Sequence, residues 1–472
     1  MYQPGMQEQV YGIQWRQQIP GYAIVRQDRP LTLEAGRGTI RFRDVAALID
    51  PTTVSFASLT DPTGTRVLEQ NFEFDLVSTQ KLMEKFIDRE ITLEQGFGER
   101  VETYTGKLLS AGMGNGLVIQ GPDGAVRAIN GYSNVRFPEL PGGLLTKPTL
   151  VWEVVTEKPG EHKTRVAYET KGITWWADYN VVFAEGKDAN SGLLDIGAWV
   201  SVLNQSGGTY RDAKLKLIAG NVNRAPQPQV REEMYMNRKM GAVAADMAAP
   251  GFEEKAFFEY HLYTLGRPAT IPDRSTKQIE LFPAARQVPC EKVMVYYGLE
   301  QHIPYYGNPM LDRNFGVQSN KKIDTYLQFK NKKDIGMGMP LPSGRIRVSK
   351  LDTADGSLEF IGEDAIDHTP KDEQVLIKLG SAFDVVGERT QTDFKVDTSR
   401  KRMEETIEIK VRNHKEEKVK VIVKENLYRW LTWEITQKSH PFEKIDARTV
   451  HFPVEVEKDG EVTIRYTVLY TW

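Results

Sequence analysis

The sequence has almost no cysteine and no long apolar run, and each absence excludes a class of protein. Cys290 is the one cysteine among 472 residues, so neither an intramolecular disulfide nor a CxxC-type zinc or redox site can form within the chain. No run approaches the roughly 18 consecutive apolar residues that a transmembrane helix needs. The sequence therefore predicts a globular chain without a membrane-spanning helix.

A charge excess is also missing. Lys and Arg total 61 and Asp and Glu total 64, which gives a formal net charge of −3. A surface that binds the phosphates of nucleic acid usually shows as a basic excess or a basic stripe. Nucleic acid is therefore not an expected partner.

Several motifs of enzymes do not occur. The sequence contains no GxxxxGK[ST], HExxH or GxSxG, so nothing supports P-loop nucleotide binding, zinc-protease chemistry or the nucleophile elbow of α/β hydrolases. A carboxylate pair for glycoside hydrolysis cannot be selected from 64 acidic residues without a fold. The sequence predicts no catalytic residue and no cofactor, apart from the metal candidates described below.

The pattern that is present is an apolar period of two, which is typical of strands with one buried face. Alternation over residues 407–411 and again over 419–423 predicts a hairpin. The chain closes with apolar residues at every second position from Val462 to Trp472, after a turn at Asp459-Gly460. Similar patterns recur at residues 193–202, 212–218, 293–297 and 326–329. The fold is expected to be mainly β, with several antiparallel sandwich domains.

One helix is expected early in the chain, and it introduces a distinct unit. Ser78 or Thr79 caps a segment whose apolar residues share one face. Five short strands follow, at residues 90–94, 102–110, 117–120, 125–129 and 134–137. A short helix before five strands is similar to a small Sm-like barrel. Because acidic and basic residues balance in this unit, it favours a packing or interaction role over RNA binding.

Breaks in the pattern predict four units. The Pro- and Gly-rich segment at residues 138–147 is expected to be a linker, residues 221–255 a mobile insertion, and residues 331–342 the boundary before the last domain. The predicted units are an N-terminal sandwich (1–77 with 139–170), the inserted Sm-like barrel (78–138), a central β domain (171–335) and a C-terminal immunoglobulin-like sandwich (336–472).

Five segments carry a resemblance to a known family: Asp50–Val54 (DPTTV), Phe137–Gly143 (FPELPGG), Trp175–Tyr179 (WWADY), Phe257–Tyr263 (FFEYHLY) and Gly362–Asp372 (GEDAIDHTPKD). Together they resemble a bacterial family of unknown function related to the mucoidy inhibitor A-like proteins, over about residues 10 to 472. The resemblance implies an exported β-rich protein in the cell envelope or outside the cell. It supplies no functional residues.

Residues 1–10 lack the basic start and apolar stretch of a secretory signal, so we expect either a cytoplasmic protein or a chain from which a signal was removed.

Two sets of residues are candidate metal ligands. Met234, Met236 and Met240 offer thioethers, which suit Cu(I); the alternative is a loose Ala/Met/Pro insertion. The second set is histidine among acidic neighbours, at His368 and at His440 with His451. Neither histidine group has a spacing that directs several ligands to one point, so polar contacts in loops are the alternative.

An aromatic concentration is the remaining candidate site. Its members are Trp175, Trp176, Tyr179 and Trp199. They could line a platform for a sugar or polymer, or they could pack between domains. Adjacent strand residues point to opposite faces, so one of Trp175 and Trp176 is expected in the core and the other outside.

Two hypotheses about function follow. The first is a non-enzymatic exported protein that acts through protein contacts or self-association, because the sequence shows many β units and no chemical centre. The second is a hydrolase that acts on an envelope polysaccharide or peptide, with unidentified residues. A cleft with convergent carboxylates or histidines would favour the enzyme.

Overall fold

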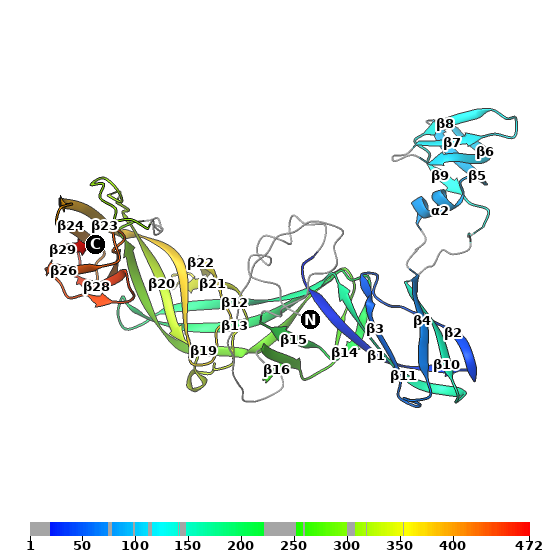
Figure 1. Ribbon diagram of the computed structural model, residues 1–472, viewed down its shortest axis with the longest axis horizontal. Coiled ribbons are helices and arrows are strands. Elements are labelled where there is room, and N and C mark those ends of the chain that lie inside the picture. The colour runs from blue at the N-terminus through cyan, green and yellow to red at the C-terminus, as the bar shows by residue number, and fades with distance from the viewer. Residues whose placement is uncertain are drawn as a thin grey trace.

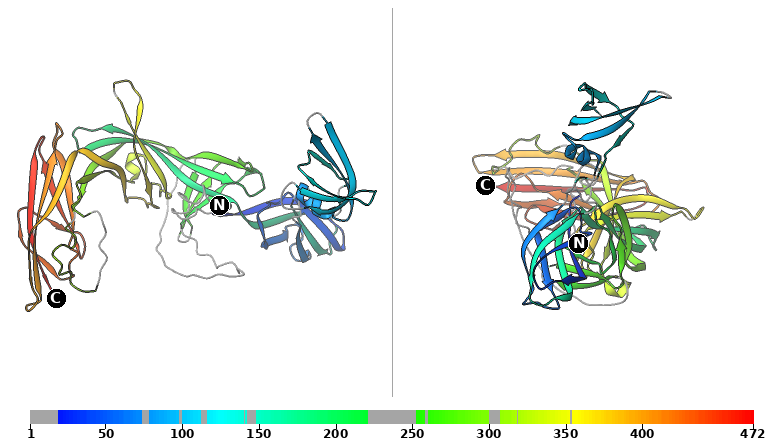
Figure 2. Two further views of the ribbon diagram at one scale, coloured as in Figure 1. Left: turned by 90° about the horizontal axis from the view of Figure 1, so that it is seen from above. Right: turned by 90° about the vertical axis from the view of Figure 1, so that its right-hand side faces the viewer.

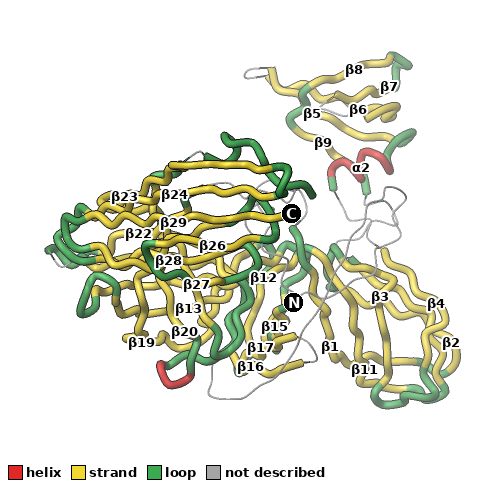
Figure 3. The backbone as a smooth tube through the Cα atoms, turned by 60° about the vertical axis from the view of Figure 1, so that its left-hand side comes forward, coloured by secondary structure: helices red, strands yellow, loops and turns green. Residues whose placement is uncertain are grey.

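The computed structural model describes residues 19–73, 78–97, 100–111, 116–139, 141, 148–220, 252–257, 260–299, 307–317, 319–352 and 354–472. Strands dominate the described residues, and the helical segments α2 and η1 are short (Figure 3). Most neighbouring strands pair antiparallel. The prediction of a mainly β chain with several antiparallel sheets is confirmed. The molecule is elongated, with the C-terminal strands β24 to β29 at one end (Figures 1 and 2).

The N-terminal strands form two three-stranded sheets that share one core. One sheet has the order β1-β11-β3: β1 (Tyr22–Leu33), β11 (Gly160–Lys171) and β3 (Ile49–Ser58). The other has the order β2-β10-β4: β2 (Gly36–Arg43), β10 (Thr149–Thr156) and β4 (Arg66–Glu73). Trp152 is fully buried, and the rings of Phe42 and Phe56 pack against it. The chain leaves this core after β4 and returns with β10, so the intervening unit is an insertion.

The inserted unit begins with the expected helix and continues with the expected strands. The Ser78 hydroxyl accepts a hydrogen bond from the Lys81 backbone N–H and caps α2 (Thr79–Lys85), which buries Met83. The sheet has the order β8-β7-β6-β5-β9: β5 (Glu90–Phe97), β6 (Arg100–Ala111), β7 (Gly116–Gln120), β8 (Val126–Asn130) and β9 (Asn134–Arg136). The two edge strands β8 and β9 are joined by residues 131–133 alone, so the sheet must curl. It is an open five-stranded sheet and not a closed barrel.

One 13-stranded sheet forms most of the remaining architecture, beside two small sheets with the orders β14-β18 and β15-β17-β16. Its main path is β22-β21-β12-β13-β19-β20-β23-β24-β29-β26, and β25, β28 and β27 branch from it. Their bounds are β12 (Ile173–Glu185), β13 (Ser191–Asn204), β19 (Ser275–Tyr297), β20 (Lys322–Lys330), β21 (Gly344–Leu351), β22 (Leu358–Ile366), β23 (Gln374–Asp397), β24 (Arg402–Asn413), β25 (Val419–Asn426), β26 (Trp433–Lys438), β27 (Glu443–Lys444), β28 (Thr449–Val456) and β29 (Glu461–Thr471). Two pairings, β12 with β21 and β19 with β25, are parallel.

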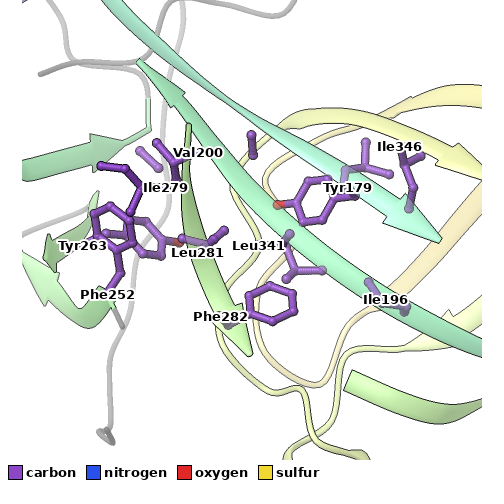
Figure 4. Close-up of a cluster of buried hydrophobic side chains, with 14 of the residues drawn as sticks. Tyr179, Ile196, Val200, Phe252, Tyr263, Ile279, Leu281, Phe282, Leu341 and Ile346 are labelled. Atoms are coloured by element: carbon purple, nitrogen blue, oxygen red, sulfur yellow. The ribbon is translucent and has the colours of Figure 1, made fainter. Parts of the chain in front are cut away.

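The strands from β22 to β23 enclose a single apolar core. Tyr179 of β12, Ile196 of β13, Leu281 of β19 and Ile346 of β21 all point into it (Figure 4). Smaller elements complete the core: β14 (Tyr210–Ala213), β15 (Lys216–Ala219), β16 (Phe252–Phe257), β17 (Tyr260–Leu265), β18 (Ala269–Ile271) and η1 (Lys333–Ile335). The sheet curls around this core, so its outer face is turned to solvent.

The cores divide the chain differently from the predicted boundary at residues 335 and 336. Leu341 and strands β21 and β22 belong to the core that β12 and β13 build. Met294 and Ile323 belong to the second core, which the C-terminal strands build. The Pro- and Gly-rich segment around Pro340 packs on the first core and is not an exposed linker, because the Tyr263 hydroxyl donates to the Pro340 carbonyl. The division into independent domains stays a prediction.

Two further expectations need correction. Residues 407–411 and 419–423 each have one buried face, but β24 and β25 do not pair with each other. Both edges of β24 are occupied, by β23 and β29, so the chain crosses to pair β25 with β28 on the far side of the same core. The insertion predicted over residues 221–255 lies outside the described residues except for 252–255, which are part of β16.

Candidate functional site

The outer face of β12 and β13 carries tryptophan beside a buried carboxylate. Trp176 and Asp178 point to this face from β12, and the register places them opposite Ser201 and Trp199 of β13. The adjoining strand β21 contributes Arg345, which is paired with Asp178 in the parallel ladder. We call these five residues the tryptophan patch.

Asp178 organises the patch through hydrogen bonds. Its Oδ2 accepts from the Trp176 indole Nε1 at 2.7 Å and from the Ser201 hydroxyl at 2.8 Å. Its Oδ1 lies 3.3 Å from Arg345 Nη2. Gln278 Nε2 donates to the Ser201 hydroxyl at 3.1 Å. A buried carboxylate needs such partners, and the same bonds fix the edge of the Trp176 indole, so its orientation is set by the sheet.

Trp199 is the exposed member of the patch, with 39% of its surface accessible. Gly197 lies two residues before it on the same face of β13 and has no side chain. A Cβ at Gly197 would meet one neighbour within 4 Å, the Asn180 carbonyl oxygen at 3.9 Å. Open space therefore lies beside the Trp199 indole, and the exposed residue Asn180 stands across from it.

An ion pair borders this space on its far side. Asp195, the next outward residue of β13, accepts from Arg286 Nη1 at 2.7 Å and from the Gln287 backbone N–H at 3.0 Å. These bonds, the backbone one foremost, hold the pKa of Asp195 below its ordinary value. The space is thus flanked by an indole at one end and a fixed carboxylate with its guanidinium at the other.

Half of the predicted aromatic platform lies in the core. Trp175 is fully buried and its ring meets the ring of Tyr263 edge-on. Tyr179 is buried too, its hydroxyl donates to the Pro342 carbonyl at 2.7 Å, and burial raises its pKa well above the ordinary value. Tyr179 is four residues after Trp175 on the same strand. Because side chains alternate between the two faces of a strand, both residues lie on one face. Trp176 and Trp199 are the members of the platform that reach the outer face.

Exposed apolar residues at the β21–β22 hairpin were missed by the sequence reasoning. Leu351 is opposite Leu358, and Phe360 is opposite Ser349, all on the outer face. We call Leu351, Leu358 and Phe360 the hairpin strip; Phe360 is 63% exposed. Their alternation is the same as that of a buried strand, so the sequence holds no signal that separates the two cases.

The structure does not bring the histidine candidates together as a metal site. The His368 ring, part of which is exposed, accepts the Ser343 backbone N–H at Nδ1, 3.0 Å away, and desolvation lowers its pKa. His440 Nδ1 lies 2.9 Å from the Ser439 hydroxyl. His451 is on β28, and burial followed by the charge of Lys424 lowers its pKa. Across the described ranges, no three His, Cys, Asp or Glu side chains gather closely enough to hold a metal ion. Met234, Met236 and Met240 lie outside the described residues.

A serine and a histidine do meet, in the N-terminal unit. Ser58 Oγ lies 2.9 Å from His162 Nδ1, and His162 Nε2 lies 2.7 Å from the Lys158 carbonyl. A carbonyl only accepts, so Nε2 carries the proton and Nδ1 accepts from the serine. Both side chains are buried, and the serine oxygen also accepts from the Asp61 N–H. The pair ties the end of β3 to the β10–β11 connection and offers no access to a substrate.

The lone cysteine is also enclosed. Cys290 is buried in the first core, and burial raises the pKa of its thiol to about 12. A thiol that stays protonated is a poor nucleophile and a poor metal ligand. Cys290 therefore acts as a small apolar residue of this core.

Comparisons of the chain with known protein families, with curated proteins and with solved structures found no match. In the part of the chain that the structure describes, no helix has the length and the apolar content needed to cross a membrane.

Proposed function

We propose that this protein acts through surface contacts, as a non-enzymatic β protein that associates with a second copy of itself. The hairpin strip carries this proposal, because Leu351, Leu358 and Phe360 place large apolar side chains in water on one face. Exposed apolar groups in one patch are typical of interaction surfaces. The proposal includes an extracytoplasmic location and kinship with the mucoidy inhibitor A-like proteins. It also includes the finer fold: N-terminal and immunoglobulin-like sandwiches and an Sm-like inserted unit.

A second copy is the partner because the strip lies on an edge strand. Within the described residues, β22 forms a strand ladder with β21 alone, and β23 packs beside Gly362 and Asp364, further along β22 than the strip. Residues 358–361 (LEFI) contain neither the lysine nor the proline that commonly protects such an edge. Two identical edges can meet antiparallel about a two-fold axis, and the same apolar side chains then face each other.

The energetics allow a contact of modest strength. Burying the three side chains of the strip is worth roughly 5 kcal/mol for each copy. Association costs about 4–15 kcal/mol in lost freedom of motion. Because the gain and the cost are of similar size, we expect a weak dimer that forms only at high protein concentration.

Sedimentation velocity over a concentration series tests the proposal. The unsubstituted protein is expected to shift from monomer to dimer as concentration rises. Phe360→Asp and Leu358→Asp are expected to remain monomeric, because a carboxylate at the contact must be desolvated. Val101→Asp is the matched control, since Val101 of β6 is 64% exposed on a different sheet, and it should dimerise normally. A protein that stays monomeric at the highest concentration, or dimerisation that Phe360→Asp does not weaken, would contradict the proposal.

The Ser58–His162 pair gives the hydrolase hypothesis no support. Its distance suits proton transfer from the hydroxyl to the imidazole. Burial of both side chains leaves no path for a polymer or a peptide. We therefore do not advance hydrolysis as a second function.

A further inference from the structure

We propose that the outer face of β12 and β13 binds a saccharide, with a sugar ring stacked on the Trp199 indole over Gly197. This goes beyond the proposed self-association, which uses residues of β21 and β22, and it can fail or succeed independently of it. The proposal depends on three features: an exposed indole, an open space next to it, and hydrogen-bonding groups around that space.

The indole is available and held in a polar setting. Trp199 is 39% exposed although its neighbours on β13, Ala198 and Val200, are buried. Opposite it stand Asp178 on β12 and Glu280 on β19. A protein contact usually surrounds such a ring with further apolar side chains. Here the surroundings are polar, which suits a ligand with an apolar ring face and a hydroxyl rim.

Gly197 provides the space for that ligand. Its backbone φ is ordinary for any residue, and the one atom near a Cβ there is the Asn180 carbonyl oxygen at 3.9 Å. Neither backbone conformation nor crowding therefore requires glycine. Any larger side chain would rise from the sheet beside the Trp199 indole and occupy the position of the stacked ring.

The rim of the space offers both donors and acceptors. Asn180 is exposed opposite Gly197, and its amide can donate and accept. Beyond Gly197 lies the pair of Asp195 and Arg286, fixed at 2.7 Å. Adjacent hydroxyls of a sugar need such mixed partners, and the geometry is set before the ligand arrives, which lowers the cost of binding.

The tryptophan patch supplies a second indole. The Trp176 edge is fixed by its 2.7 Å bond to Asp178, and Trp176 is only partly buried. By the register it lies diagonally across from Trp199. The register places Trp176 on the side of Trp199 away from Gly197, so an oligosaccharide that reaches both indoles must pass over Trp199, and the ring over Gly197 is expected to contribute most of the binding.

Saturation-transfer NMR on the full chain tests the proposal. The probes are soluble β-1,4-linked oligomers of glucose and of N-acetylglucosamine, and β-1,3-linked oligomers of glucose. Saturation is expected to reach the ring C–H protons of at least one probe. Trp199→Ala should lower the affinity for that probe about tenfold or more, because the stacking surface is removed. Gly197→Val should have a similar effect, because the isopropyl group fills the space.

Two control variants show whether a loss of binding is specific to this site. Gly38→Val introduces the same side chain at a partly exposed strand glycine whose Cβ would meet no described atom within 4 Å, and it should bind normally. Phe360→Asp disrupts the hairpin strip, and it should also bind normally if the two surfaces are independent. Circular dichroism confirms that each variant is folded.

Three results would overturn the proposal. The first is no saturation transfer to any of the probes at millimolar concentration. The second is transfer that survives both Trp199→Ala and Gly197→Val. The third is a change of sedimentation in Trp199→Ala without a saccharide signal, which would show the patch to be a protein contact.

Discussion

Arg429→Met is expected to release the segment of residues 307–317 from the C-terminal core. The guanidinium of Arg429 is fully buried, and its Nε lies 3.0 Å from Glu405 Oε1. Nη1 donates to the carbonyls of Met310 and Asp312, at 2.9 and 2.8 Å. Nη2 donates to the carbonyl of Phe315 at 3.1 Å. One side chain thus holds three carbonyls of an irregular segment against β24.

The expected loss of stability in Arg429→Met follows from the buried groups that lose their partner. Removal of one partner of a buried ion pair costs about 3–5 kcal/mol, because the other charge stays buried. The carbonyls of Met310, Asp312 and Phe315 also lose the guanidinium as a donor, but the Phe315 carbonyl keeps the Tyr428 hydroxyl at 2.9 Å and the Asp312 carbonyl keeps the Phe315 N–H at 3.3 Å, so this adds about 1–2 kcal/mol. The expected loss of roughly 5 kcal/mol is comparable with the whole stability of a domain. Local opening of residues 307–317 is therefore expected before global unfolding.

Two measurements follow this loss. Hydrogen exchange read by mass spectrometry should show the peptide that covers 307–317 losing protection, and denaturant unfolding should give the change in free energy. Arg465→Met is the control: Arg465 is exposed and pairs with Glu408 at 2.6 Å, so its removal should cost less than about 1 kcal/mol. If Arg429→Met costs no more than the control and exchange is unchanged, the reasoning is refuted.

The loss of stability in Arg429→Met is also expected to depend on pH. Burial already raises the pKa of Glu405, against the charge of Arg429. Without Arg429 the folded-state pKa rises further above the unfolded value. A carboxyl whose folded pKa is raised binds its proton more tightly in the folded state, so its stability contribution is present at low pH and is lost as pH rises. The deficit of Arg429→Met should therefore be smaller at pH 5 than at pH 7.5.

Two further predictions concern single polar groups. Desolvation of the imidazole lowers the pKa of His368, so the unfolded state binds more protons and stability should fall as pH drops below about 6.5. His368→Asn keeps an acceptor for the Ser343 N–H without titrating, so unfolding curves at pH 7.5 and 5 should show a smaller fall; an unchanged fall would assign the pH dependence elsewhere. Among the described residues the buried Thr174 hydroxyl has no hydrogen-bond partner, so Thr174→Val should stabilise by about 1 kcal/mol in denaturant unfolding; destabilisation would mean that the hydroxyl has a partner.

The inserted unit shows what local sequence encodes well. Ser78, the helix and all five strands appear where capping and alternation predicted them. These signals are local: a cap needs one side chain, and alternation needs one buried face. The chain topology of this unit also follows its order, since each of β5 to β7 pairs with the next strand.

The C-terminal core shows what alternation cannot encode. Residues of β24 and β25 alternate as expected, yet the two strands lie in different ladders. Alternation specifies a face and not a partner, so a crossing connection has the same pattern as a hairpin. The buried pairs Arg389–Glu425 and Arg429–Glu405 also have no signature, because charged residues are normally assigned to the surface.

Neither the tryptophan patch nor the hairpin strip could be located from the sequence, for opposite reasons. Trp175 and Tyr179 were candidate site residues and lie in the core, whereas Leu358 and Phe360, whose alternation is also typical of a buried strand, are exposed. Residue type alone therefore could not separate the candidate site from the packing around it. The curl of the sheet determines which residues are buried, because it turns one face of each strand inward.

That division between faces makes the proposed surfaces testable without loss of the fold. Along β13, Ile196, Ala198 and Val200 are fully buried and supply the packing, while Gly197 and Trp199 alternate with them and face outward. Truncation of Trp199 removes ring surface that is already partly in water and breaks no hydrogen bond of the Asp178 network. Because 39% of Trp199 is exposed and the rest is packed, the expected cost to stability is about 2 kcal/mol, below that of a core tryptophan. A loss of saccharide binding in Trp199→Ala with a cooperative unfolding curve and no larger loss of stability would therefore report on the surface and not on the core.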